Sequence, residues 1–490
     1  MTNSSQSVSS SKPMNMILFM PDQLRAESIG CYGHPLVQTP NMDRLAHEGV
    51  RFEYCQSGSP LCAPARCDMA TGLPPHVSGH RMFGNLLQPH EPNLFRYLKA
   101  GGYDVLWYGR NDLLVQDQFE SSATEWNSFE DGPAWMGAGN PWPKDDPHYF
   151  SFLFSEGTDR RDYPDYLRVK KAIEVLEQRD SDKPFCLYLP LFNPHPPFFG
   201  PQGFHDMYDP KDIPELRPIG LPNKPGYYDA IRSKRRLDQL DDLDFRTVNA
   251  IYLGMISYTD WLLGELLEAV ERTGHTEDTA VLFFSDHGDW AGDYGLLEKW
   301  SSAMDDPLIR VPFIARVPGG EAGLASQNII ELRDLMATCL DLAGLEAEHT
   351  HFSESLLPLI HGEPGDPHRA AFSEGGYNPN DQKCFLPEEM FDPYHIYYPK
   401  NSLEYEQPAM ISRTAAIRTR DFKLVWRPDY ESELYDLKED PLELQNVFGD
   451  ASYAAVQEGL ARRIFDWYMR TSDVAFHGAM PMELPGVSGK

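Results

Sequence analysis

The sequence lacks the features that define several classes of protein. None of its seven cysteines forms a CxxC pair and one would be left over from any full pairing, which argues against a disulfide scaffold or a zinc knuckle. No apolar run approaches the roughly 18 to 20 residues that a membrane helix requires. The first thirteen residues, MTNSSQSVSSSKP, contain no apolar stretch of the kind found in a secretory signal. We therefore expect residues 1–13 to form a flexible tail and the protein to be cytoplasmic, with no membrane as a partner.

Basic residues are also scarce. The chain has 43 Lys and Arg against 74 Asp and Glu, which gives a formal net charge of −31 at pH 7. This charge repels nucleic acid and anionic lipid, so we expect neither as a partner. It also repels an anionic substrate, so a site for an anion would have to gather its few cations locally.

The hydrophobic content is that of a globular enzyme with an α/β core. The 490 residues, 41% of them hydrophobic, exceed what one minimal core requires. Predicted helices at 166–177 and 245–272 alternate with predicted strands at 103–108, 185–189 and 279–284. This rhythm predicts a large, mostly parallel central sheet flanked by helices.

The chain is predicted to have two domains. We expect the α/β catalytic domain to span residues 14–365. The pattern then changes to short strands at 415–419 and 423–426 and a helix at about 453–469. We therefore expect a smaller C-terminal α+β subdomain at 366–490, with a small antiparallel sheet and a helix.

Two of the predicted strands end in acidic residues. Asp22 and Gln23 follow the first strand of the chain, and Asp286 and His287 follow a later one. Because ligands gather at the carboxyl ends of strands in such sheets, we expect these four side chains to hold one divalent metal ion. Oxygen ligands suit Ca²⁺, whereas the imidazole weakens the case for Ca²⁺ and leaves Mn²⁺ as a competitor. For each aspartate taken alone, a turn or loop cap is the alternative.

The most informative segment is CAPAR at residues 62–66, which is followed by a Thr-Gly ending. It resembles the CxPxR modification motif of the type I sulfatases of the alkaline phosphatase superfamily, with Ala65 where serine is commoner. The resemblance implies that a formylglycine-generating or equivalent maturing enzyme oxidises Cys62 to formylglycine. Its hydrate would offer one hydroxyl to attack the ester and another to expel the product. One hydroxyl would bind the metal, which lowers its pKa, with Arg66 as the nearby cation. A buried structural thiol is the alternative for Cys62.

Four further residues match positions of this family. His195, in NPHPP after a predicted strand, is similar to the histidine that donates a proton to the leaving alcohol. Lys299 lies twelve residues after His287, a spacing similar to that of the lysine that holds the transferred group. Arg110 and Asn85 resemble substrate-binding positions, Asn85 that of the phosphonate hydrolases. The alternatives are a packed loop histidine for His195, a solvated surface lysine for Lys299 and a helix or turn cap for Asn85.

Two C-terminal segments bear on the site. Residues 385–408 contain an aromatic cluster that can overhang the pocket, and stacking on a ring, ordinary loop packing and an onium cage for choline remain open. Residues 433–447 resemble the LYDLxxDPxExxNL ending of sulfatases. We expect this ending to pack the small domain on the large one.

The prediction is thus a formylglycine-dependent sulfuric ester hydrolase that releases inorganic sulfate from an aryl, alkyl or carbohydrate sulfate. Gln23 and His287 resemble the choline sulfatase and phosphonate monoester hydrolase branches. A phosphonate monoester or phosphodiester hydrolase with the same site is therefore the first alternative. A non-catalytic binder of sulfated glycans is the second, and a homo-oligomer is left open.

Overall fold

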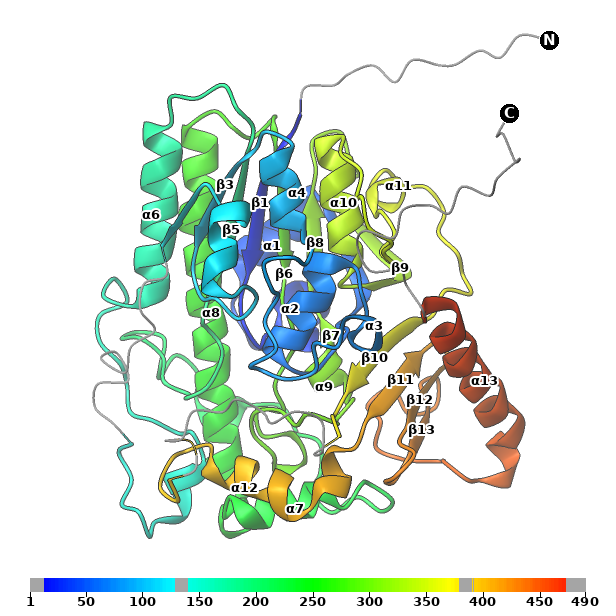
Figure 1. Cartoon of the computed structure of the whole chain (residues 1–490). Coiled ribbons are helices and arrows are strands. Elements are labelled where there is room, and N and C mark those ends of the chain that lie inside the picture. Colours follow the sequence, from blue (N-terminus) through cyan, green and yellow to red (C-terminus); the bar gives the residue numbers. More distant parts are fainter. Residues whose placement is uncertain (1–12, 128–139, 379–389, 391, 473–490) are drawn as a thin grey trace, which may run out of the picture.

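A large sheet forms the centre of the protein in the computed structural model, which describes residues 13–127, 140–378, 390 and 392–472 (Figure 1). Its strands are β1 (Asn15–Met20), β2 (Val50–Gln56), β3 (Asp104–Tyr108), β4 (Glu125–Asn127), β5 (Phe185–Pro190), β6 (Thr279–Phe284), β7 (Arg310–Val311), β8 (Phe313–Arg316) and β9 (Leu324–Glu331). The nine strands follow the order β4-β3-β5-β1-β6-β8-β2-β7, and β9 pairs with β2.

Most neighbours in this sheet are parallel. β1 is central and runs parallel to β5 and β6, while β3 runs parallel to β4 and β5. β8 runs antiparallel to β6 and β2, and the short β7 runs antiparallel to β2. The predicted fold class, a large mostly parallel sheet in an α/β domain, is confirmed.

Helices cover both faces of the sheet. One face packs against α1 (Pro40–Glu48), α6 (Pro164–Gln178) and α8 (Asp242–Arg272), and the other against α2 (Cys62–Thr71), α4 (Leu94–Ala100) and α10 (Asp334–Ala343). The short helices are α3 (Pro75–Ser78), α5 (Phe119–Ser122), α9 (Asp306–Ile309) and α11 (Leu357–Ile360). Because successive side chains of a strand point to opposite faces, Ile17 and Phe19 enter the first core and Met16 and Leu18 the second. β1 is thus buried on both faces, which explains its apolar sequence.

The predicted boundary of the long helix α8 differs from the observed one by three residues. The side chain of Asp241 accepts a hydrogen bond from the backbone N–H of Asp244, and the Asp244 side chain accepts one from the Asp241 N–H. This capping box satisfies amide groups that otherwise lack partners at a helix start. The helix therefore begins at Asp242, ahead of the first apolar residue of its pattern.

The C-terminal part contains the predicted small antiparallel sheet. Its strands are β10 (Ala371–Gly375), β11 (Thr414–Arg418), β12 (Phe422–Trp426) and β13 (Glu433–Asp436). α13 (Ala454–Thr471) covers one face through Leu460 and Ile464, while α12 (Tyr398–Glu406) and α7 (Tyr227–Lys234) lie together at the lower edge of the molecule (Figure 1). The division at residue 365 stays a prediction. None of the helices in the described ranges is both long and apolar enough to cross a bilayer.

Buried charges join the small sheet to the large domain. The Lys423 ammonium on β12 donates to the Met304 carbonyl at 2.7 Å, lies 3.1 Å from Asp306 Oδ1 and pairs with Glu443. Arg418 on β11 pairs with Asp306 as well. Glu443 accepts a hydrogen bond of 2.9 Å from the backbone N–H of Asp306. The segment 433–447 thus packs the small domain on the large one, as its sequence predicts.

This junction can be tested with Lys423→Met. Removing the ammonium leaves Asp306 and Glu443 facing each other in a buried space, because Lys423 is fully buried. We expect the free energy of unfolding to fall by about 3 kcal/mol or more, as for other broken buried pairs. Chemical denaturation followed by circular dichroism measures the change.

The matched control is Lys438→Met, which removes an ammonium 2.8 Å from Asp421 in a pair whose lysine side chain is 64% exposed. Exposed ion pairs contribute about 1 kcal/mol or less to stability, so the free energy of unfolding should fall only slightly. Equal effects of the two substitutions would contradict a stabilising role for the buried junction.

Candidate active site

Four buried side chains converge where β1 and β6 end. Asp22 follows β1, Asp286 and His287 follow β6, and Cys62 is the first residue of α2. Each offers a ligand atom, and these atoms all lie within 4.8 Å of one another. The Cys62 Sγ atom lies 3.0 Å from His287 Nε2 and 3.6 Å from Asp22 Oδ1. The structure therefore brings together two distant strand ends and the motif cysteine.

The orientation of His287 suits a metal ligand. Its Nδ1 atom lies 2.9 Å from the Gly288 carbonyl, to which it donates. The lone pair of Nε2 is then directed at Cys62 and Asp22, since neutral imidazole has one donor and one acceptor nitrogen. Burial lowers the pKa of His287 to about 3, so the ring is neutral at ordinary pH.

Arg66 joins the two carboxylates. It lies one helical turn after Cys62, so both side chains leave the same face of α2. Its Nε donates to Asp286 Oδ2 at 2.8 Å and its Nη2 to Asp22 Oδ2 at 2.6 Å. Arg110 also donates to Asp22 Oδ2, at 2.9 Å. Asp22 is therefore held by two guanidinium groups.

The electrostatics of this group fit a divalent cation. Burial and then the charge of Asp286 raise the pKa of Asp22. Burial opposes ionisation of Asp286 too, but His287 and Arg66 hold its pKa below the usual range. Two buried carboxylates, an imidazole and the Cys62 position form a donor set that a divalent cation would stabilise. Burial and then Asp22 also raise the pKa of the Cys62 thiol, so the unmodified residue is no thiolate nucleophile.

Gln23 is held by charged partners on both ends of its amide. Its Nε2 donates to Asp289 Oδ2 at 2.5 Å, and its Oε1 accepts from the Lys299 ammonium at 2.5 Å. The amide oxygen, predicted as a metal ligand, thus faces Lys299 beside the cluster. The backbone of Gln23 has φ 69°, a left-handed conformation that costs energy for a residue other than glycine.

His195 and Lys299 are neighbours, as the predicted roles require. The His195 Nδ1 donates to the Pro196 carbonyl at 2.6 Å, and its Nε2 accepts from the Lys299 ammonium at 3.2 Å. Burial and then Lys299 lower the pKa of His195 well below its usual value, so its ring is neutral in the free protein. The pair is fully enclosed in protein, with Lys299 2% exposed and His195 6%.

Sequence reasoning missed the residues that support Lys299. Glu298 is buried, its Oε1 lies 3.3 Å from the Lys299 ammonium, and its Oε2 lies 3.0 Å from that of Lys400 on α12. Arg235 approaches the same carboxylate at 3.9 Å. The adjacency of Glu298 to Lys299 is a signal that could have been used. Lys400 lies about a hundred residues away in sequence and gives none.

Among the described residues, no hydrogen bond joins Asn85 to the metal group. Its backbone carbonyl accepts from His80 Nδ1 at 2.6 Å. Asn85 lines a separate cavity of about 330 Å³ together with Arg81, Tyr377 and Arg413, and none of the four metal-group residues lines that cavity. Its substrate contact stays a prediction. In the aromatic segment, Phe391 lies outside the described residues.

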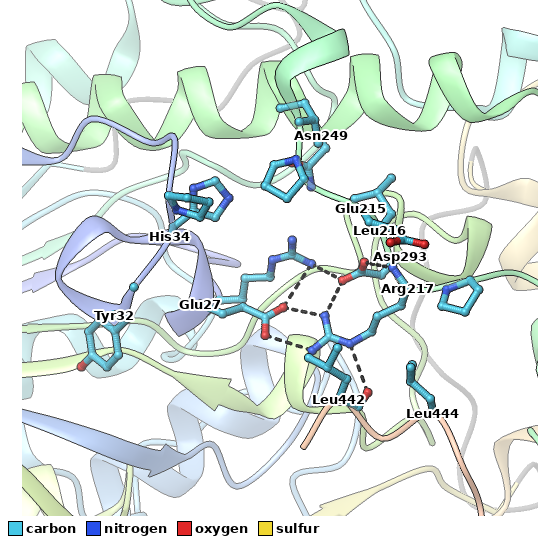
Figure 2. Close-up of a pocket in the computed structure, with 16 residues that line it drawn as sticks. Glu27, Tyr32, His34, Glu215, Leu216, Arg217, Asn249, Asp293, Leu442 and Leu444 are labelled. Carbon is cyan, nitrogen blue, oxygen red and sulfur yellow. Dashed lines mark hydrogen bonds and ion pairs between the residues drawn. The ribbon is translucent and has the colours of Figure 1, made fainter. Parts of the chain in front are cut away.

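Another cavity, of about 500 Å³, is lined by Arg25, Glu27, Arg217 and Asp293 among others, and by none of the four metal-group residues (Figure 2). Arg25 and Arg217 each donate to Asp293 Oδ2 at 2.7 Å, and Arg217 also pairs with Glu27 at 2.7 and 2.9 Å. Two cations thus balance two anions, so this quartet has no charge to spare for an anionic ligand. Arg217 Nε also donates to the Leu442 carbonyl, which ties the C-terminal segment to this wall.

Comparison with known proteins assigns the family. Residues 14–345 match the family model described as Sulfatase, and residues 387–469 match one described as N-sulphoglucosamine sulphohydrolase, C-terminal. The chain therefore belongs to the sulfatase family. A metal ion and a formylglycine are general features of this family, and the buried group of Asp22, Cys62, Asp286 and His287 can hold the ion.

Three relatives cover nearly the whole chain. Multifunctional alkaline phosphatase superfamily protein PehA from Trinickia caryophylli is 29% identical, with 93% of each chain covered. N-acetylglucosamine-6-O-sulfatase from Bacteroides thetaiotaomicron is 26% identical, covering 92% of this chain and 85% of that protein. The phosphonate monoester hydrolase of Agrobacterium radiobacter superposes with a TM-score of 0.75 at 25% identity, covering 94% of this chain and 96% of that one. The predicted enzyme class, a sulfuric ester hydrolase of the sulfatase family, is confirmed, and the phosphonate hydrolase alternative also has a structural neighbour.

Metal affinity provides a test of the ligand group. We expect Asp22→Asn and Asp286→Asn each to weaken binding of Mn²⁺ and Ca²⁺ by more than about 100-fold, because losing even an outer partner of a ligand costs about 10- to 100-fold. Isothermal titration calorimetry on chelator-treated protein measures the affinities and shows which ion is preferred.

Asp260→Asn is the matched control. Asp260 is also buried, but it accepts hydrogen bonds from the backbone N–H groups of Asn41 and Met42 at the start of α1. This substitution should lower stability and leave metal affinity unchanged. Wild-type affinity in Asp22→Asn would refute the proposed ligand set.

Proposed function

We propose that this enzyme hydrolyses the sulfate ester of an organic alcohol through a formylglycine made from Cys62. The observation that carries the proposal is the gathering of Arg66, Arg110, Lys299 and His195 around the buried acidic group in a chain of net charge −31. Preorganised cations of this kind stabilise the charge that develops on a transferring sulfuryl group. Sulfated amino sugars are the first substrates to test, given the relative named N-acetylglucosamine-6-O-sulfatase.

Asp22, Asp286, His287 and modified Cys62 would hold the metal, with the Gln23 amide oxygen beside them. The bound ion would lower the pKa of the formylglycine hydroxyl, which supplies a nucleophile near neutral pH. Mn²⁺ and Ca²⁺ are both candidates, and the imidazole ligand favours Mn²⁺. A formylglycine-generating or equivalent enzyme is the partner that this chemistry requires.

The remaining side chains act on the sulfuryl group and on the leaving alcohol. Arg66 and Arg110 converge at Asp22 and are placed to orient the sulfate oxygens. His195 Nε2 is placed to pass a proton to the leaving oxygen. The ring is neutral in the free protein, so Nε2 must first gain a proton of its own, while the Lys299 ammonium 3.2 Å away would stabilise the charge that develops on the leaving oxygen.

Phosphonate monoester hydrolysis is the second candidate. Gln23 and His287 favour it by resemblance, and the phosphonate monoester hydrolase of Agrobacterium radiobacter shares the fold. Initial rates on 4-nitrophenyl sulfate, phenyl phosphonate monoester and bis-aryl phosphodiester distinguish the candidates. A sulfate rate that is lowest by orders of magnitude would replace the leading proposal with the second.

Cys62→Ala is expected to abolish sulfate release while leaving the fold intact, because no other side chain of the cluster can supply the attacking hydroxyl. Mass spectrometry of the peptide containing Cys62 should show a loss of about 18 Da on conversion of the thiol to the aldehyde. The matched control is Cys186→Ala, a buried thiol on β5 outside the cluster. Full activity of a protein whose Cys62 remains an unmodified thiol would contradict the proposal.

A further inference from the structure

Phe83 is an exposed aromatic side chain beside the catalytic lysine. It lies in the loop between α3 and α4 and is 37% exposed. Its ring centroid is 5.9 Å from the Lys299 ammonium and 5.8 Å from that of Lys400. A large apolar face open to solvent costs free energy unless something covers it. Nothing in the proposed chemistry of sulfate transfer uses this ring.

Phe83 lies near the residues that the proposed reaction assigns to the leaving alcohol. The sulfuryl group is placed by Arg66 and Arg110 at the metal group, whereas the alcohol oxygen must reach His195. Lys299 lies 3.2 Å from His195 Nε2, and the Phe83 ring borders the same ammonium. An alcohol that continues from His195 past Lys299 would therefore reach the Phe83 ring.

The charges around the ring restrict what the alcohol can be. The Phe83 ring borders two ammonium groups, those of Lys299 and Lys400, which share the buried carboxylate of Glu298. An onium alcohol such as choline would be repelled there, although an isolated aromatic ring attracts such cations. A flat ring with apolar C–H or π faces would instead pack on Phe83.

We propose that Phe83 determines specificity by packing against a ring-shaped alcohol, sugar or aryl, that is uncharged or anionic. This inference rests on the proposed sulfatase function and names its substrate class. The choline option left open by the aromatic segment is thereby disfavoured.

Three primary alkyl sulfates test the proposal, because they share the type of leaving oxygen and differ in ring and charge. They are N-acetylglucosamine 6-sulfate, ethyl sulfate and choline sulfate. In the metal-loaded, formylglycine-bearing enzyme, Phe83→Ala should lower kcat/KM for the sugar sulfate about tenfold through KM, with kcat little changed. The kcat/KM for ethyl sulfate should stay within about twofold, and the wild type should prefer the sugar sulfate to choline sulfate.

Phe83→Tyr should retain the wild-type pattern and Phe83→Leu should resemble Phe83→Ala, since leucine keeps apolar volume without a ring. Phe465→Ala is the matched control, because Phe465 is a 63% exposed phenylalanine on α13. Equal losses on sugar and ethyl sulfates, no loss on either, or a preference for choline sulfate would overturn the inference while sulfate hydrolysis itself stands.

A wild-type enzyme that cleaves only phosphonate esters would instead overturn the proposed function. The role of Phe83 would then be tested with the phenyl and methyl esters of one phosphonate. Phe83→Ala should lower kcat/KM for the phenyl ester and leave that for the methyl ester little changed. An enzyme inert toward both ester classes would remove both proposals together.

Discussion

Two buried carboxylates in one small space require positive charge between them, and this constraint organises the site. Asp22 and Asp286 meet because β1 and β6 are parallel neighbours whose ends lie at one edge of the sheet. Arg66 offsets part of this negative charge, because it reaches both acids from α2, one helical turn after Cys62. The position of Cys62 and the neutralisation of the metal group therefore depend on one helix.

The cations around the metal group are also paired with acidic residues. The chain is strongly acidic, yet Arg66, Arg110 and Lys299 lie at or beside the metal group, and these cations have further acidic partners. Asp112 contacts Arg110 at 3.0 Å, and Glu298 contacts Lys299 from the buried side. In the cavity lined by Arg25, Glu27, Arg217 and Asp293, two cations are instead balanced by two anions.

The sequence was informative wherever function depends on local pattern. The strand ends that carry Asp22 and Asp286, the cysteine motif and the spacing of Lys299 could be predicted because each is encoded in a short segment or in a strand with a recognisable period. The amide of Gln23 shows the limit, since its orientation depends on Asp289 and Lys299. Lys400 could not be predicted, because a contact between α12 and the loop before α9 is a property of tertiary packing alone.

Lys400 also shows that the C-terminal part helps to hold residues of the candidate active site in place. Glu298 has φ 68°, a left-handed conformation that a non-glycine residue keeps only when its surroundings hold it there. Lys400 on α12 supplies one of those restraints, and Glu298 in turn contacts Lys299. Because the same Lys400 ammonium borders the Phe83 ring, a shift of α12 moves the support of Lys299 and the wall of the alcohol pocket together. If Lys299 and Phe83 act as proposed, alcohol recognition and sulfuryl transfer are coupled through one buried carboxylate, and changes in α12 that alter specificity should also alter kcat.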